Sequence, residues 1–484
     1  AQDICSASLQ LRFSKVAPPS SAMQDTKALG SSSLKSLAST SFGASSQSSE
    51  STIEDTPDDL YGPLLRGLGS AVLFGWWPRS RSWNRTELIE RTTRCLPGVR
   101  PNVDFVALPL LPEVEELWSY WSQAHGLSSQ QAVWFNPRLE GSSVSDDPAL
   151  DACREVLAEM ACSLNVVFYP MYWLSEIVQE AINIDMPIIG DPEDHKLMPL
   201  NAAKAWLHPH IGAHDSCCLR TVLSALGGRV RGPKGFVAYS VDELREAFAQ
   251  LRQECPVGTR FVLKPADGSG GCGVVLDATE ADLDACMFGS SRSSVILEEM
   301  VIGLDKPQSP TLYMLGDKAC GPLADQVLAD DCATNLGNRF PSMLQDEDLF
   351  SACVTAAQEI NKTWGMTSNW GLDFVLDKDG GAVIVDINMG RPSGNFAVRL
   401  WASLSERPLT VFTGSWTAPQ NNGPSMESIF EFLHAANCLW NGEEGVIVYQ
   451  YVPGCPSSYA IASVHGPDAV SQLQARLAKA MLDD

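Results

Sequence analysis

The chain has 484 residues, of which 45% are hydrophobic and 19% are charged, a composition typical of globular proteins with room for two or three domains. The formal net charge is −24, so neither nucleic acid nor an anionic membrane is expected as a partner, because both need a basic protein face. The longest apolar runs of the sequence fall far short of a membrane span.

The first 57 residues are predicted to be a disordered tail. Sixteen of the first 52 residues are serine, and the segment shows no apolar periodicity that could offset its ordering entropy. Its basic residues are also typical of an organellar transit segment, while a plain flexible tail is the alternative reading.

The 14 cysteines form no CxxC motif, which favours a reducing compartment over a disulfide framework. The expected location is therefore the cytoplasm, or a plastid or other organelle if the tail is a transit segment.

Residues 58–191 alternate between strand-like and helix-like stretches. Such alternation predicts an α/β layer with a largely parallel sheet. The helices are expected to begin near Arg85, Pro112 and Pro148, and the strands to cover 71–77, 104–111, 132–135, 165–172 and 187–190.

A lysine followed by glycines stands in the next region, 192–404, where residues 261–274 read FVLKPADGSGGCGV. An apolar strand carries Lys264, and the loop after it contains Gly268, Ser269, Gly270, Gly271 and Gly273. Glycines let backbone N–H groups turn toward phosphate oxygens, to which the lysine adds a positive charge. No GxxxxGK[ST] motif occurs, so this is not a Walker loop.

Residues 371–394 predict a hairpin with polar groups at its far end. Two apolar strands, 374–376 and 382–387, flank the turn 377–381, and their pairing sets Asp373 opposite the end that carries Asp386 and Asn388. Two carboxylates and an amide oxygen suit Mg²⁺, with Mn²⁺ as an alternative. An ordinary hairpin with solvated acids is the competing interpretation.

Other elements of this region follow from capping and periodicity. Ser240 and Glu243 predict a capping box for a helix that ends near Cys255. An amphipathic helix is expected at 347–364, and further strands at 295–301, 311–315 and 324–328.

Taken together, residues 192–404 resemble the ATP-grasp superfamily, with fold class α/β overall and α+β in the grasp. The preceding 58–191 region resembles the pre-ATP-grasp domain, and 405–484 predicts a small C-terminal α/β cap with helices at 425–440 and 468–482 and strands at 445–451 and 459–465. The cap and the run 309–341 are similar to those of pheganomycin-type peptide ligases.

The resemblance implies roles for individual residues. Lys204 and Lys264 would bind phosphate, and Arg391 would stabilise charge on the transferring group. The segment EEMVIGLD matches the nucleotide-binding hinge, with Glu298, Glu299, Met300 and Val301 near adenine and Asp305 on the ribose. Asp373, Asp386 and Asn388 match the metal ligands.

Two departures qualify this match. Asp386 stands where most members carry Glu, and Gly371 where some carry Arg. A non-catalytic ATP-binding module therefore remains an alternative.

The implied activity is an ATP-dependent carboxylate–amine ligase that forms an amide or peptide bond through an acyl phosphate. Its substrates would be small carboxylates and amines such as amino acids or short peptides, and dimers are frequent among such enzymes. An ATP-grasp enzyme with another acceptor, a carboxylase or a phosphotransferase, is the alternative.

His208, His210 and His214 also raise the question of a zinc site. Pro209 and Gly212 interrupt their spacing, which favours packing and hydrogen bonding over metal binding.

Overall fold

The computed structural model of the chain describes the elements in which most of the predicted site lies. All of the residues that the structure describes belong to the unit Asp55–Asp484. The expected tail 1–57, the strand at 187–190 and the helix near Pro148 lie outside them. The described residues are 71–74, 85–93, 95–96, 99, 102, 104–135, 167–170, 204–212, 218–224, 228–266, 273–286, 294–301, 308–328, 335–344, 346–367, 369–389, 410–416, 426–450 and 457–483.

The first sheet is parallel, as the alternation of strands and helices predicts. Its strands β1 (Ala71–Phe74), β2 (Phe105–Pro109), β3 (Ala132–Phe135) and β4 (Val167–Pro170) lie in the order β3-β2-β1-β4. The helical elements between them are α3 (Arg85–Thr93), α4 (Pro112–Ala124) and the 3₁₀ turn η3 (Ser129–Gln131). Within the described residues, no helix has the length and apolar character to cross a membrane.

Helix α4 shows how local sequence produces this layer. Pro112 occupies the first turn, where its missing N–H costs nothing, and Glu113 and Glu115 complement the helix dipole. Val114, Leu117, Trp118 and Trp121 follow helical spacing and are buried. Both tryptophans therefore serve packing, as expected from the sequence.

The second sheet carries the predicted lysine strand and the hinge. Its strands pair in the order β6-β9-β7-β8 and are antiparallel: β6 (Gly235–Ala238), β9 (Val295–Glu299), β7 (Phe261–Pro265) and β8 (Val275–Leu276). Helices α10 (Val241–Glu254) and α11 (Glu280–Ala285) belong to the same core cluster.

The start of α10 differs in one detail from the predicted capping box. The Ser240 side chain accepts a hydrogen bond from Glu243 N, as expected, but the Glu243 carboxylate accepts from Tyr239 N instead of returning to Ser240. His210 provides a second contact to the same carboxylate at 3.2 Å. The carboxylate half of the predicted capping box is thus replaced by a hydrogen bond from Tyr239 N and a tertiary contact from His210.

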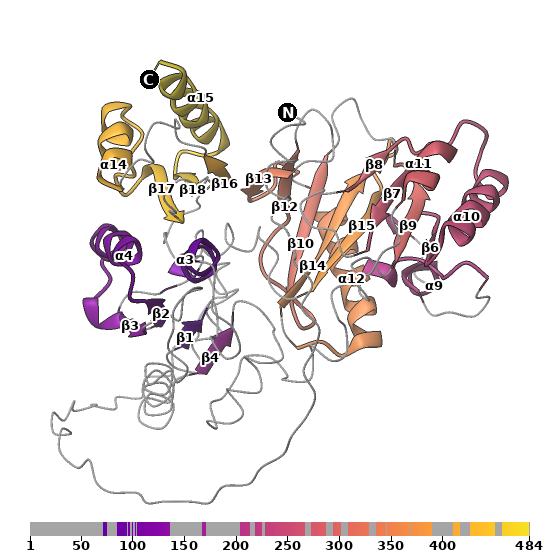
Figure 1. Ribbon diagram of the computed structural model, residues 1–484, viewed down its shortest axis with the longest axis horizontal. Coiled ribbons are helices and arrows are strands. Elements are labelled where there is room, and N and C mark those ends of the chain that lie inside the picture. The colour runs from indigo at the N-terminus through magenta and orange to yellow at the C-terminus, as the bar shows by residue number, and fades with distance from the viewer. Residues whose placement is uncertain are drawn as a thin grey trace, which may run out of the picture. The chain divides into compact units, whose positions relative to one another are not determined.

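The third sheet contains the predicted metal hairpin and extends into the C-terminal region (Figure 1). Its strand order is β17-β18-β16-β13-β12-β10-β14-β15-β5, with β11 paired to β10. The strands are β5 (Val230–Arg231), β10 (Ser309–Leu315), β11 (Lys318–Ala319), β12 (Ala324–Leu328), β13 (Asn335–Phe340), β14 (Asn369–Leu376), β15 (Ala382–Met389), β16 (Thr410–Trp416), β17 (Glu444–Gln450) and β18 (Ser457–Ser463). The helices of this region are α9 (Leu219–Ser224), α12 (Glu347–Trp364), α14 (Met426–Ala435) and α15 (Pro467–Asp483).

The hairpin β14–β15 packs one face against α12. Trp370, Leu372 and Phe374 alternate along β14, are fully buried, and share a core cluster with Ile360 of α12. The helix begins at a cap in which Asp346 accepts from Leu349 N, and it ends at Gly365, whose φ of 70° favours glycine.

A β-bulge in β15 decides which side chains face away from α12. Asp373 pairs with Asp386, yet Phe374 pairs with Ile384, so Val385 has no partner in this ladder. Before the bulge, even-numbered residues such as Ile384 join the core, and after it the odd-numbered Ile387 does. Because the bulge takes Val385 out of the alternation, Asp386 and Asn388 lie on the face of Asp373 while Ile384 and Ile387 both join the core.

Deleting Val385 should give a regular ladder, because Ile384 and Asp386 then pair with the adjacent residues Phe374 and Asp373. Ile384 and Ile387 would stay in the core and Asp386 would stay on the face of Asp373, so we expect the free energy of unfolding to change by about 2 kcal/mol or less. Chemical denaturation measures this value. The control Val385→Ala keeps the bulge and should lose about 1 kcal/mol or less. A loss of about 3 kcal/mol or more on deletion would contradict the assignment, because it would mean that Val385 holds a regular strand position and that its removal turns the following side chains to the other face.

Candidate nucleotide and metal site

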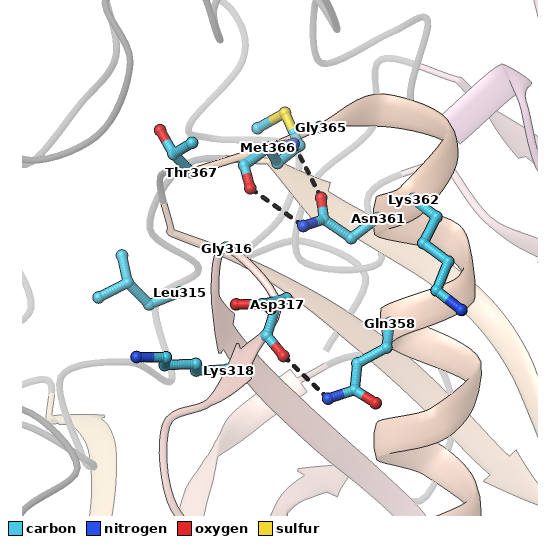
Figure 2. A pocket seen from close by; sticks show the side chains of 10 residues that line it. All are labelled: Leu315, Gly316, Asp317, Lys318, Gln358, Asn361, Lys362, Gly365, Met366 and Thr367. Atoms are coloured by element: carbon cyan, nitrogen blue, oxygen red, sulfur yellow. Dashed lines mark hydrogen bonds between the residues drawn. The ribbon is translucent and has the colours of Figure 1, made fainter.

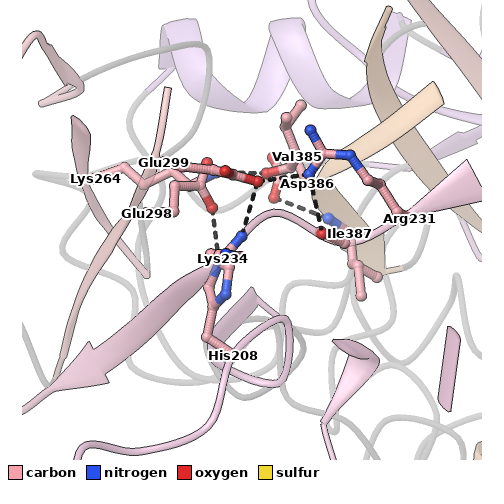
Figure 3. A network of polar contacts seen from close by, with 10 residues as sticks. His208, Arg231, Lys234, Lys264, Glu298, Glu299, Val385, Asp386 and Ile387 are labelled. Atoms are coloured by element: carbon pink, nitrogen blue, oxygen red, sulfur yellow. Dashed lines mark hydrogen bonds and ion pairs between the residues drawn. The ribbon is translucent and has the colours of Figure 1, made fainter. Parts of the chain in front are cut away.

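The two predicted phosphate-binding lysines both reach the far end of the metal hairpin. Lys204 Nζ lies 2.9 Å from Asp386 Oδ2, and Lys264 Nζ donates to the Val385 carbonyl oxygen at 2.5 Å. The bulge leaves that carbonyl beside Asp386 for the lysine of β7 (Figure 3). Residues 182 and 121 positions apart in the sequence thus meet at one place.

Asp373 is held by donors from neighbouring strands. Thr311 Oγ1 donates to Asp373 Oδ1 at 2.9 Å, and Asn388 Nδ2 donates to Oδ2 at 2.8 Å. Gln326 of β12 hydrogen bonds to the same carboxylate. This side chain is only 8% exposed, so its oxygens keep a fixed direction.

The neighbourhood of Asp373 is electrostatically costly without a cation. Burial, and after it the charge of Asp386, raises the pKa of Asp373 from 3.8 to about 6. Hydrogen bonds from Thr311 and Gln326 and the charge of Lys204 oppose the rise without cancelling it.

These residues fit a divalent metal by the chemistry of their donors. The described residues contain no group of three or more His, Cys, Asp or Glu placed to hold an ion, so two carboxylates must be completed by another oxygen. The amide of Asn388 lies beside Asp373 and would offer its oxygen after turning over. Two adjacent carboxylates, an amide and open positions for phosphate match the preference of Mg²⁺.

Lys264 has a second partner in the hinge strand. Its Nζ lies 2.5 Å from Glu298 Oε1, and the other oxygen of Glu298 lies 2.7 Å from His208 Nε2. Burial raises the pKa of Glu298, but the charge of Lys264 and the hydrogen bond to His208 outweigh it and leave the pKa below its ordinary value. Glu298 therefore stays ionised.

The hinge backbone is partly committed to other contacts. The N–H group of Glu299 donates to Lys234 O at 2.7 Å, and that of Met300 donates to Arg260 O at 2.8 Å. The Glu299 carboxylate accepts from Arg231 at 2.5 Å. Recognition of an adenine edge here would thus depend on carbonyl groups or on Val301 rather than on these two amides.

Several predicted residues lie outside the described part of the chain. These are Asp305, Arg391 and four members of the glycine loop, Gly268, Ser269, Gly270 and Gly271. Gly273, the last glycine of the loop, is described and has a φ of 79°, a conformation that favours glycine.

Three contributors to the site were not assigned these roles from the sequence: Thr311, the Val385 carbonyl and His208 as a partner of Glu298. Thr311 lies in β10, whose residues are all buried, and belongs to no motif. The carbonyl of Val385 depends on a bulge that pairing alone reveals. Only the polar character of Thr311 next to the apolar run that follows it could have indicated its position.

The two described histidines of the segment 208–214 have different partners. His208 contacts Glu298, whereas His210 contacts Glu243 on α10. His214 lies outside the described residues. The two described rings are thus engaged by carboxylates on separate elements, which agrees with the preference for packing and hydrogen bonding.

A cavity of about 690 Å³ lies beside the β10–β11 turn and the end of α12, and no predicted site residue lines it (Figure 2). Gln358 Nε2 donates to Asp317 O at 3.2 Å, and Asn361 exchanges hydrogen bonds with the backbone of Met366. These polar side chains stabilise the turns around the cavity, so we do not assign the nucleotide to it.

Comparison with known protein families identifies the domain that this geometry suggests. Residues 242–395 match the ATP-grasp domain family, within the region 192–404 predicted from the sequence. The chain therefore contains an ATP-grasp domain. A search of curated proteins finds no match.

Several solved structures are similar to this chain. The ADP complex of N5-carboxyaminoimidazole ribonucleotide synthetase aligns with a TM-score of 0.50 at 13% identity, covering 85% of this chain and 96% of the other. The same synthetase from Thermus thermophilus gives 0.47 at 14% identity, covering 85% and 98%. The biotin carboxylase domain of Hydrogenobacter thermophilus 2-oxoglutarate carboxylase gives 0.46 at 12%, covering 82% and 86%. At this identity the first match shows the fold.

The raised pKa of Asp373 makes a prediction about stability. Without metal, Asp373→Asn should increase the free energy of unfolding at pH 7 by about 1–3 kcal/mol, because the folded state no longer buries this charge. The pKa is higher in the folded than in the unfolded state, so the gain should appear as pH rises from about 4 to 6 and vanish below. Urea unfolding at several pH values measures it.

The exposed Asp317→Asn is the matched control and should change stability by about 0.5 kcal/mol or less at every pH. A loss of stability at pH 7 in Asp373→Asn would contradict the electrostatic account of the site.

Proposed function

We propose that this chain is an ATP-dependent ligase that joins a carboxylate to an amine through an acyl phosphate. The observation that carries the proposal is the convergence of Lys204 and Lys264 on the strand end that holds Asp386, next to Asp373. Two cations beside a pair of carboxylates form a site for a nucleotide triphosphate with its metal. The relative of known structure that contains ADP has the same fold.

In this proposal the two lysines exchange their protein contacts for phosphate oxygens. Lys204 would leave Asp386, and Lys264 would leave the Val385 carbonyl while its ammonium group keeps its contact with Glu298. Asp373, Asp386 and Asn388 would hold Mg²⁺, which neutralises charge on the β- and γ-phosphates when bound.

The γ-phosphoryl group then passes to a substrate carboxylate, the bond to the β-phosphate oxygen breaks, and ADP is formed. The amine attacks the carbonyl of the acyl phosphate, phosphate leaves, and the amine loses a proton as the amide forms. Arg391 is the proposed stabiliser of charge in both steps. Closure of the glycine loop around Gly268–Gly271 would exclude the water that hydrolyses an acyl phosphate.

The finer assignment to amino acid or peptide substrates rests on the sequence resemblance to peptide ligases. The test is ADP release by the purified protein with ATP, Mg²⁺, and pools of amino acids and short peptides, followed by product mass. A product equal to acid plus amine minus water supports the ligase. A product heavier than the amine by one CO₂, formed with bicarbonate, would instead indicate a carboxylase, and a phosphorylated acceptor would indicate a phosphotransferase.

Removal of either the proposed phosphate-binding lysine or a proposed metal-ligating carboxylate should stop turnover. Lys264→Met and Asp373→Asn should each lower the rate of ADP release by about 100-fold or more, because each removes an interaction with the transferring phosphates. Coupled-enzyme detection of ADP measures the rates, and circular dichroism checks the fold.

Lys362→Met is the matched control for the lysine, since Lys362 lies on α12 and pairs with Glu359. It should keep the full rate. Full activity in Lys264→Met or Asp373→Asn would contradict the site assignment, and ATP binding without turnover in the unaltered protein would favour the non-catalytic module.

A further inference from the structure

His208 is a buried titratable side chain that the proposed reaction does not use. Its side chain has no exposed surface, and its Nε2 lies 2.7 Å from Glu298 Oε2 (Figure 3). Its Nδ1 has no hydrogen-bond partner among the described residues. A buried imidazole with only one of its two nitrogens engaged calls for an explanation.

The contacts define the protonation state of this ring. Glu298 is ionised and can only accept, so Nε2 must carry the hydrogen. Burial lowers the pKa of His208 more than Glu298 raises it, so the ring is neutral and the lone pair lies on Nδ1. An unpaired lone pair costs less than the unpaired N–H that a charged ring would bury. His208 thus acts as a neutral donor to Glu298.

Glu298 divides its two oxygens between two elements. Oε2 accepts from His208, while Oε1 faces Lys264, which also reaches the Val385 carbonyl. Rotation of the carboxylate would break both contacts. The donor on Oε2 therefore fixes the oxygen that holds Lys264.

The ring of His208 is itself fixed by close packing. Gly235 of β6 lies so close to the ring that any side chain there would collide with it. A Cβ added to Gly235 would be 2.7 Å from His208 Cε1 and 2.7 Å from Leu297 O. The segment that carries His208 is bound to the same strand, because Val237 N donates to Pro209 O and Ile211 N donates to Val237 O. These contacts place the imidazole directly against β6.

We infer that His208 is a positioning residue for the nucleotide: through Glu298 it holds Lys264 where the phosphates of ATP are bound. The inference rests on the proposed function, and it assigns His208 a role in nucleotide affinity beyond filling space in the core.

The test compares MgADP affinity by titration calorimetry in two variants. His208→Leu keeps the bulk but removes the donor, so we expect about tenfold weaker binding, the effect of one hydrogen bond to a charged group. His208→Gln places an amide N–H near the position of Nε2 and should bind within about threefold of the unaltered protein. If the Leu variant does not fold, His208→Asn, whose shorter amide cannot reach Glu298, replaces it.

His210→Leu is the matched control, because this histidine also contacts a glutamate but lies two residues away and touches Glu243 instead. It should leave MgADP affinity unchanged. A double variant adds a further readout. His208→Leu combined with Glu298→Gln should bind MgADP no more weakly than Glu298→Gln alone, because both substitutions affect Lys264 through its contact with residue 298.

The outcomes separate the inference from the function on which it rests. If the unaltered protein binds MgADP and His208→Leu binds equally well or more tightly, the positioning role is wrong while the nucleotide site stands. Equal weakening in the Gln and Leu variants, or additive losses in the double variant, would also overturn it. If the unaltered protein binds neither MgADP nor MgATP, the proposed function fails first, and the inference with it.

Discussion

The β-bulge at Val385 is the local feature on which the geometry of the candidate site depends. Strand residues alternate between faces, so a ladder that ran regularly through Val385 would turn Asp386 to the face opposite Asp373 or expose the apolar partners of α12. The bulge avoids both outcomes: Asp386 shares the face of Asp373, and Ile384 before the bulge and Ile387 after it both remain in the core. It also leaves a carbonyl oxygen beside Asp386 that Lys264 occupies.

Charge balance is the second organising feature. In a chain with net charge −24, an anionic nucleotide needs a local basic site, and Lys204 and Lys264 are both drawn to it by carboxylates. Those contacts keep buried cations paired without ligand. In the proposed function the phosphates and the metal take over the same partners, so the site exchanges one set of neutralising contacts for another.

The C-terminal region contains both elements that the local sequence predicted and strands that it did not. The helices and strands at 425–440, 445–451, 459–465 and 468–482 were predicted and correspond to α14, β17, β18 and α15. The strands β13 and β16, which connect them to the grasp sheet, were not predicted. Asn335, Gly337 and Asn338 give β13 a low strand propensity, and pairing with β12 and β16 overrides it.

The sequence by itself determined the ATP-grasp region, the helix 347–364, the hairpin with its turn, and the pairing of Asp373 with the Asp386 end. These features depend on interactions among near neighbours, where periodicity, capping and turn residues act. Only the tertiary structure decided the bulge at Val385, the contact of Lys204 with Asp386, and the link from His208 to Lys264. Each of these joins residues that are far apart in the chain or depends on ladder register, and neither packing distance nor register is encoded in a local pattern.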